Sequence, residues 1–197
     1  MHMALSGDGR RTVVLHDLGG MGKTQLAVAY AKRNRNSYSA VFWLNIKDEN
    51  SLKQSFTKVA SQILREHPSA SRLSSVDMKN LDDVVDAVKA WLSLPSNTRW
   101  LIIYDNYDNP KLPGNTDPAV VDIRKFLPES YQGSVIVTTR LSQVKIGHRI
   151  QVGKLKDVTE SLQILSNASG RECDINGEYC SDYPLRDQHL VCHRLPH

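Results

Sequence analysis

The feature that most constrains this chain is a glycine-rich stretch, HDLGGMGKTQLA, at residues 16–27. It lies between an apolar segment, TVVLH, and a segment with helical spacing, LAVAYA. A strand, a glycine turn and a helix in this order aim backbone N–H groups from the start of the helix, where they attract anions. The stretch matches the end of the phosphate-loop pattern G-x-x-x-x-G-K-[ST] at Gly22, Lys23 and Thr24. Its first position holds Asp17 instead of glycine.

In such a loop the lysine reaches the β and γ oxygens of a polyphosphate, and the hydroxyl of Thr24 is a ligand for Mg²⁺. The alternative is a plain glycine turn, and the flanking strand and helix favour the phosphate-binding interpretation. Asp17 adds a negative charge near an anionic ligand and a Cβ where the turn prefers none. We therefore expect Asp17→Gly to tighten nucleotide binding, unless the carboxylate points away to solvent.

The hydrophobic pattern of the rest of the chain alternates between strands and helices. It predicts helices at residues 23–33, 51–66, 80–94 and 157–165, with Asn80 and Asp83 as an N-cap pair. It predicts strands at residues 12–16, 40–46, 100–105, 134–139 and, less regularly, 149–152. Strands separated by helices indicate an α/β fold, a three-layer sandwich with a mostly parallel five-stranded sheet.

A second candidate site element is LIIYDN, an apolar strand that ends in Asp105. A carboxylate at the end of a strand beside a phosphate loop can hold Mg²⁺ directly or through water. The next residue is Asn106, whose amide cannot serve as a general base at neutral pH. Asp108 is a further candidate for a catalytic carboxylate, provided that its side chain turns toward the loop.

A third element is GSVIVTTR at residues 133–140, a strand that ends in polar residues. Its last residue, Arg140, can contact a γ-phosphate and so report whether that phosphate is present. The alternative is an ordinary strand followed by a surface arginine.

Together these stretches, with VFWLNIKDENSLKQSFTKVASQI, resemble the nucleotide-binding core of NB-ARC proteins, the STAND class of signalling P-loop NTPases, in a fungal NLR-like form. The resemblance covers about residues 10–165 and implies an adenine-nucleotide switch of innate immunity, with ADP at rest, ATP in the active state and Mg²⁺. It implies that Asp105 is the Walker B acid and that Thr24 and Asp105 hold the metal. The implied nucleotide contacts are Gly19, Gly20, Met21, Gly22, Lys23, Thr24, Gln25 and Arg140.

The resemblance also predicts how the chain is divided. Residues 1–170 are expected to be a P-loop nucleotide-binding domain that lacks the family's adenine-pocket segment and helical lid, and residues 171–197 an irregular, non-homologous tail. The tail offers zinc-type ligands, but the lack of a C-x-x-C pair disfavours a metal site, and the pattern favours retained intron or shifted-frame sequence instead. These ligands are Cys173, Cys180, His189, Cys192 and His193.

Composition and charge indicate the general class of protein but do not decide its function. The chain has 197 residues, 40% of them hydrophobic and 23% charged, and a formal net charge of +4, as expected for a globular protein. We expect a cytoplasmic protein without membrane contact, because no signal peptide or long apolar run is visible. The expected function is a nucleotide-binding switch with slow or no hydrolysis, in a homo- or hetero-oligomer with NLR-type receptors. The first alternative is a degenerate interaction piece without nucleotide, and the second is a competent ATPase. The scattered basic residues predict no specific nucleic-acid partner.

Overall fold

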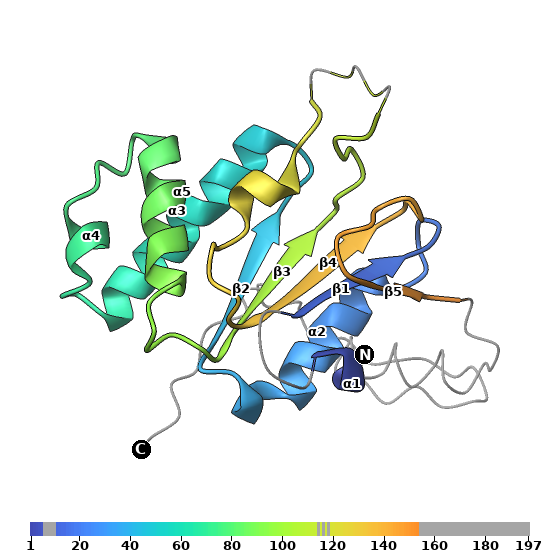
Figure 1. Cartoon of the computed structure of the whole chain (residues 1–197), viewed down its shortest axis with the longest axis horizontal. Helices are drawn as coiled ribbons and strands as arrows, with labels where there is room; N and C mark the ends of the chain where they lie inside the picture. Colours follow the sequence, from blue (N-terminus) through green and yellow to red (C-terminus); the bar gives the residue numbers. More distant parts are fainter. Residues whose placement is uncertain (6–10, 114, 116, 118, 154–197) are drawn as a thin grey trace, which may run out of the picture.

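The computed structural model describes residues 1–5, 11–113, 115, 117, 119–153, and a five-stranded, wholly parallel sheet forms its centre (Figure 1). The spatial order of the strands is β2-β3-β4-β1-β5. Their bounds are β1 (Arg11–His16), β2 (Ala40–Asn45), β3 (Trp100–Asp105), β4 (Ser134–Thr139) and β5 (His148–Gln151).

Helices lie between successive strands, except between β4 and β5, and they cover both faces of the sheet (Figure 1). The longer ones are α2 (Lys23–Arg33), α3 (Glu49–Glu66) and α5 (Leu81–Leu92), and the short ones are α1 (His2–Leu5), α4 (Ser71–Ser74) and the 3-10 turns η1 (Arg35–Ser37) and η2 (Ile123–Phe126). The sequence-based prediction of five strands and three long helices is confirmed, with every boundary within two residues. The helix expected at residues 157–165 and the tail lie outside the described residues.

The core is divided by the sheet because successive side chains of a strand point to opposite faces. Val14 of β1 and Ile102 of β3 belong to the cluster beneath α3 and α5. Their neighbours Val13, Leu15 and Ile103 belong to the cluster beneath α1 and α2. This arrangement confirms the predicted α/β class, a three-layer sandwich of the P-loop NTPase type.

The helices on the first face begin at polar caps. The side chain of Asp48 accepts a hydrogen bond from the backbone N–H of Ser51 at 2.7 Å, at the start of α3. At the start of α5, the side chain of Asn80 accepts from the N–H of Asp83 at 3.5 Å, which confirms the predicted N-cap pair. Such caps satisfy backbone donors that the helix itself leaves unpaired.

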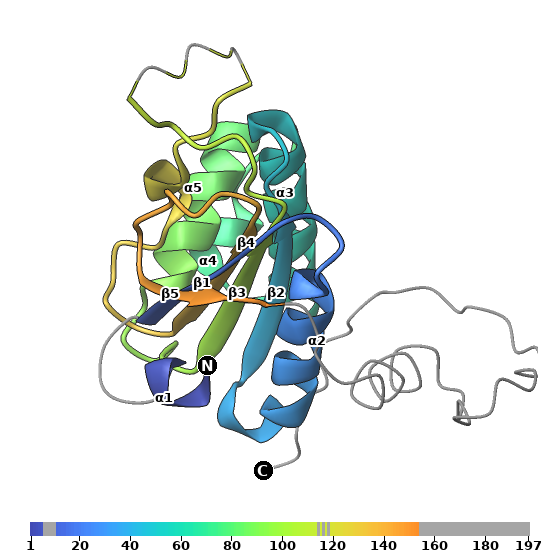
Figure 2. The same ribbon diagram turned by 90° about the vertical axis from the view of Figure 1, so that its right-hand side faces the viewer.

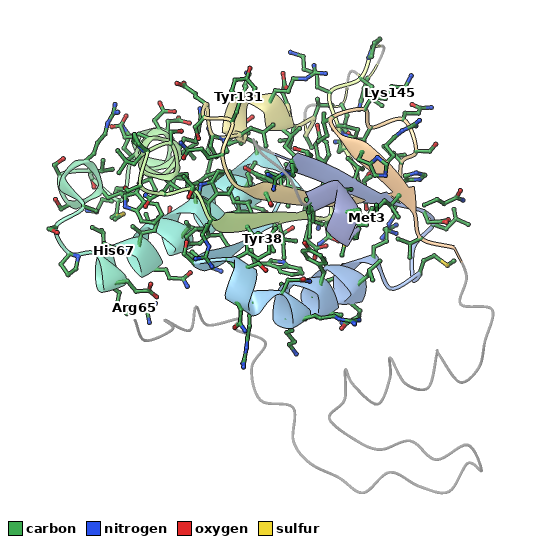
Figure 3. All side chains as sticks on the ribbon, turned by 60° about the horizontal axis from the view of Figure 1, so that its bottom comes forward. Met3, Tyr38, Arg65, His67, Tyr131 and Lys145 are labelled. Atoms are coloured by element: carbon green, nitrogen blue, oxygen red, sulfur yellow. The ribbon has the colours of Figure 1, made fainter. Side chains whose placement is uncertain are left out.

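On the second face, two tyrosines join α2 to the residues that lead into β2. Tyr38 lies between the sheet and α2 (Figure 3), and its hydroxyl is 3.0 Å from that of Tyr30. Burial and the neighbouring Tyr38 hydroxyl raise the pKa of Tyr30 far above its ordinary value. The Tyr30 hydroxyl therefore keeps its proton further into the alkaline range than an ordinary tyrosine does.

The strand order determines where a site can form. Because β4 lies between β1 and β3, the loops that follow these three strands leave the sheet side by side (Figure 2). In open α/β sheets ligands bind outside the carboxyl ends of the strands, where the strand order reverses. Within the described residues no helix is long and apolar enough to cross a membrane.

Candidate functional site

A pocket of about 300 Å³ opens at the carboxyl ends of β1, β3 and β4. The segments that form it are the three that the sequence singled out, and they lie far apart along the chain. Its lining residues are Gly19, Gly20, Met21, Gly22, Lys23, Thr24, Gln25, Asn106, Asp108, Thr138, Thr139 and Arg140. All eight residues predicted to contact a nucleotide are among them.

The glycine loop has the backbone geometry that an anion site requires. Gly20 and Gly22 have φ angles of 80° and 75°, a region that residues with a Cβ rarely adopt. Gly22 is the N-cap of α2, and no side chain caps this helix or places a carboxylate in its first turn. The first N–H groups of α2 therefore face the pocket with their positive partial charge uncompensated by an acid.

Lys23 is folded back under the loop. Its ammonium Nζ donates to the carbonyl oxygens of Asp17 at 2.8 Å and Leu18 at 2.7 Å, and the residue is 9% exposed. These two bonds hold the charged end of the lysine beside the glycine backbone. The structure thus brings a nearly buried positive charge into the pocket wall.

Asp105 is not among the lining residues, but it contacts two of them and is 6% exposed. Its Oδ1 accepts hydrogen bonds from the hydroxyls of Thr24 at 2.9 Å and Thr138 at 2.5 Å. The carboxylate predicted to hold a metal is therefore adjacent to the hydroxyl predicted to share it. Within the described residues no group of three or more His, Cys, Asp and Glu side chains is placed to hold a metal. A hard cation here would need further oxygens from water or phosphate, which Mg²⁺ ordinarily uses.

Asn106 has a backbone role that the sequence did not reveal. Its φ angle is 68°, in the left-handed region, where asparagine is better tolerated than most residues. Its N–H donates to the hydroxyl of Thr138 at 3.0 Å, and the N–H of Tyr107 donates to the carbonyl of Thr138 at 2.9 Å. This turn ties the end of β3 to the end of β4; Tyr107 then enters the core, and Asp108 lines the pocket.

The last of these residues, Asp108, meets Arg140. Its Oδ2 is 3.1 Å from Nε of Arg140, and its Oδ1 accepts from the backbone N–H of Arg140 at 2.7 Å. Asp108 therefore does line the pocket, as its candidacy as a catalytic carboxylate required. Because both oxygens are engaged by Arg140, the arrangement favours a role as partner of the arginine over that of general base.

Three parts of the site were missed by sequence reasoning. These are the bond from Thr138 to Asp105, the left-handed turn at Asn106, and the pairing of Asp108 with Arg140. The one local signal was asparagine itself, which occurs at positive φ several times more often than most residues. The other two depend on β4 lying beside β3.

Asp17, the departure from the phosphate-loop pattern, is outside the residues that line the pocket. Its Oδ1 accepts from the N–H of Leu18 at 2.7 Å, so the carboxylate is turned toward its own chain. This orientation favours a small effect of the Asp17 charge on nucleotide binding over the tightening expected for Asp17→Gly.

We expect Asp17→Asn, which keeps the acceptor and removes the charge, to change nucleotide affinity by less than about threefold, since a partly exposed charge outside the pocket is largely screened by water and salt. Equilibrium titration at two salt concentrations measures the effect. A tightening of tenfold or more at low salt would show that the charge of Asp17 does act on the ligand.

The parallel sheet, its flanking helices and the glycine loop between β1 and α2 define a sandwich of the P-loop NTPase type. No protein-family model matches the sequence. The chain is 26% identical over 167 residues to a nucleotide-binding leucine-rich repeat (NLR)-like protein from Hyaloscypha variabilis. The match covers 79% of this chain and 16% of that relative, so the chain spans less than a fifth of the relative's length. It is therefore similar to a part of an NLR-like protein.

Proposed function

We propose that this chain is the adenine-nucleotide-binding switch module of an NB-ARC or NLR-like protein, and that it hydrolyses ATP slowly or not at all. The observation that carries the proposal is the convergence of Lys23, Thr24 and Asp105 at the uncapped start of α2. The similarity to an NLR-like protein supports the signalling context. In that context the module acts in the cytoplasm, in innate immunity, and associates with NLR-type partners.

The residues present fit a nucleotide with its magnesium. The N–H groups of the loop and the ammonium of Lys23 match the negative charge of a diphosphate or triphosphate. The bonded pair of Thr24 and Asp105 supplies hard oxygen ligands, as Mg²⁺ prefers. When bound, the metal would neutralise phosphate charge.

The proposal of slow hydrolysis is supported by the lack of a free carboxylate among the residues that line the pocket. Asn106 occupies the position after Asp105 at which an acid could activate water. Asp108, the one carboxylate among the lining residues, is paired with Arg140. Neither Asn106 nor Asp108 therefore offers a free carboxylate as the base.

The test is isothermal calorimetry of the purified chain with ADP and ATP, each with Mg²⁺ and with a chelator. We expect binding in which Mg²⁺ improves affinity. Asp105→Asn is the matched variant, because its amide oxygen can still accept from Thr24 and Thr138 while the metal-binding charge is lost. We expect the improvement by Mg²⁺ to fall about tenfold or more in this variant, with chelated affinities alike, since a carboxylate is the harder metal ligand.

Experiments on the same purified protein distinguish this proposal from a degenerate interaction piece and from a competent ATPase. Absence of binding by wild-type protein under all four conditions would leave the degenerate interaction piece as the better description. Phosphate release at about 1 s⁻¹ or faster, within the ordinary range for enzymes, would establish a competent ATPase instead. Full dependence on Mg²⁺ in Asp105→Asn would show that the metal is held elsewhere.

A further inference from the structure

The ion pair between Asp108 and Arg140 has no part in the binding scheme above, yet both residues line the pocket. The guanidinium of Arg140 lies over the glycine loop, with its central carbon 3.6 Å from the place where a Cβ on Gly19 would be. The side chain of Arg140 is nevertheless 66% exposed. An arginine this exposed would sample many rotamers unless another group restrained it.

Asp108 makes the contacts that restrain the side chain of Arg140. The carboxylate holds Nε of Arg140 at 3.1 Å and its backbone N–H at 2.7 Å, so one group restrains both the backbone of the arginine and the near side of its guanidinium. Asp108 is itself fixed, because Tyr107 beside it is 3% exposed and its hydroxyl donates to the carbonyl of Val121 at 3.0 Å. The restraint thus comes from a rigid turn and not from a second mobile side chain.

The contact leaves the end of the arginine available. Arg140 meets Asp108 through Nε and the backbone N–H, and within the described residues neither Nη1 nor Nη2 of Arg140 donates a hydrogen bond. These two terminal nitrogens carry the paired donors with which arginine binds phosphate. The pairing also offsets the charge of Asp108, which would otherwise repel an anion in the pocket.

We propose that Asp108 is a positioning residue that sets the preference of the site for a triphosphate over a diphosphate. It does so by holding Arg140 over the loop with its terminal donors free for the outermost phosphate. This inference rests on the proposed function, because it needs a polyphosphate in the pocket. It assigns to Asp108 a role through Arg140 and not through contact with the ligand.

The experiment compares dissociation constants for ADP and ATP, with Mg²⁺, in wild-type protein and in Asp108→Asn. We expect the ratio of the ADP constant to the ATP constant to fall about fivefold, because the arginine must then be ordered during binding. Arg140→Gln should lower the ratio further, since it removes the donors and leaves the carboxylate unpaired. The double variant should bind ATP better than Arg140→Gln alone. Asp86→Asn, which removes an exposed acid that pairs with Lys89 on α5, is the control and should leave the ratio unchanged.

A second readout does not need nucleotide. In the NMR spectrum of the free protein, the Nε–H of Arg140 should give a resolved, exchange-protected signal that is lost in Asp108→Asn. Absence of that signal in wild-type protein overturns the positioning role, whether or not nucleotide binds. A ratio that is unchanged or that rises in Asp108→Asn also overturns the inference, and a rise would mean that Asp108 restrains Arg140 from the phosphate. Failure of the wild-type protein to bind either nucleotide refutes the proposed function itself and, with it, the claimed preference.

Discussion

Replacing Gly133 with alanine is expected to lower the free energy of unfolding by about 3–5 kcal/mol, the sum of backbone strain and overpacking. Gly133 precedes β4 and has a φ angle of 69°. A Cβ there would overlap the Cδ2, Cε2 and Cε3 atoms of Trp100. The indole cannot move aside, because it is 1% exposed and its Nε1 donates to the carbonyl of Leu92 at 2.9 Å. A domain at the low end of ordinary stability, about 5 kcal/mol, would be left barely folded.

Urea denaturation monitored by tryptophan fluorescence measures the loss. Gly153→Ala is the matched control, because nothing lies within 4 Å of a Cβ at that position and its φ is not in the left-handed region. We expect the control to stay within about 0.5 kcal/mol of wild type. A loss below about 1 kcal/mol in Gly133→Ala would contradict the close contact between this glycine and Trp100.

Replacing Lys23 with alanine is expected to weaken ADP and ATP binding at least about 100-fold, which corresponds to the loss of roughly 3 kcal/mol of charge-assisted hydrogen bonding. The lysine is the nearly buried cation of the pocket, and its Nζ is already held at the loop by the carbonyls of Asp17 and Leu18. Its charge is therefore placed before a ligand arrives. The measurement is calorimetric or fluorescence titration at constant salt.

Lys32→Ala is the control for this variant, because it removes the same charge from an exposed position in the last turn of α2. We expect Lys32→Ala to bind within about twofold of wild type, since an exposed charge away from the site is largely screened. Equal weakening in both variants would mean that net charge, and not the loop, holds the nucleotide. Unchanged affinity in Lys23→Ala would remove the lysine from the site.

Most of the fold could be predicted because its signals are local. The spacing of apolar residues in α5, the side-chain cap at Asn80 and the glycines after β1 each act within a few residues of the chain. The same holds for the loop residues of the pocket, since a strand, turn and helix position them without help from distant segments. The predicted nucleotide contacts Lys23 and Thr24 therefore line the pocket.

The wider site could not be predicted in the same way. The sequence offers Asp108 as a candidate catalytic carboxylate, and the structure pairs it with an arginine 32 residues away. In the sequence Asn106 stands where an acid could activate water, and the structure shows that it also forms a left-handed turn. In both cases the chemistry of the residue was visible, whereas its partner depended on which strand lies next to β3.

The sequence by itself therefore determined the elements, the α/β class and the composition of the phosphate loop, because each follows from periodicity or from a local motif. The tertiary structure alone decided the order of the strands. β3 and β4 are buried along their whole length, so neither carries an alternating pattern that would identify its neighbours. Packing placed β4 between β1 and β3, with Tyr104 opposite Val137, and this register brings Thr138 to Asp105 and Arg140 to Asp108.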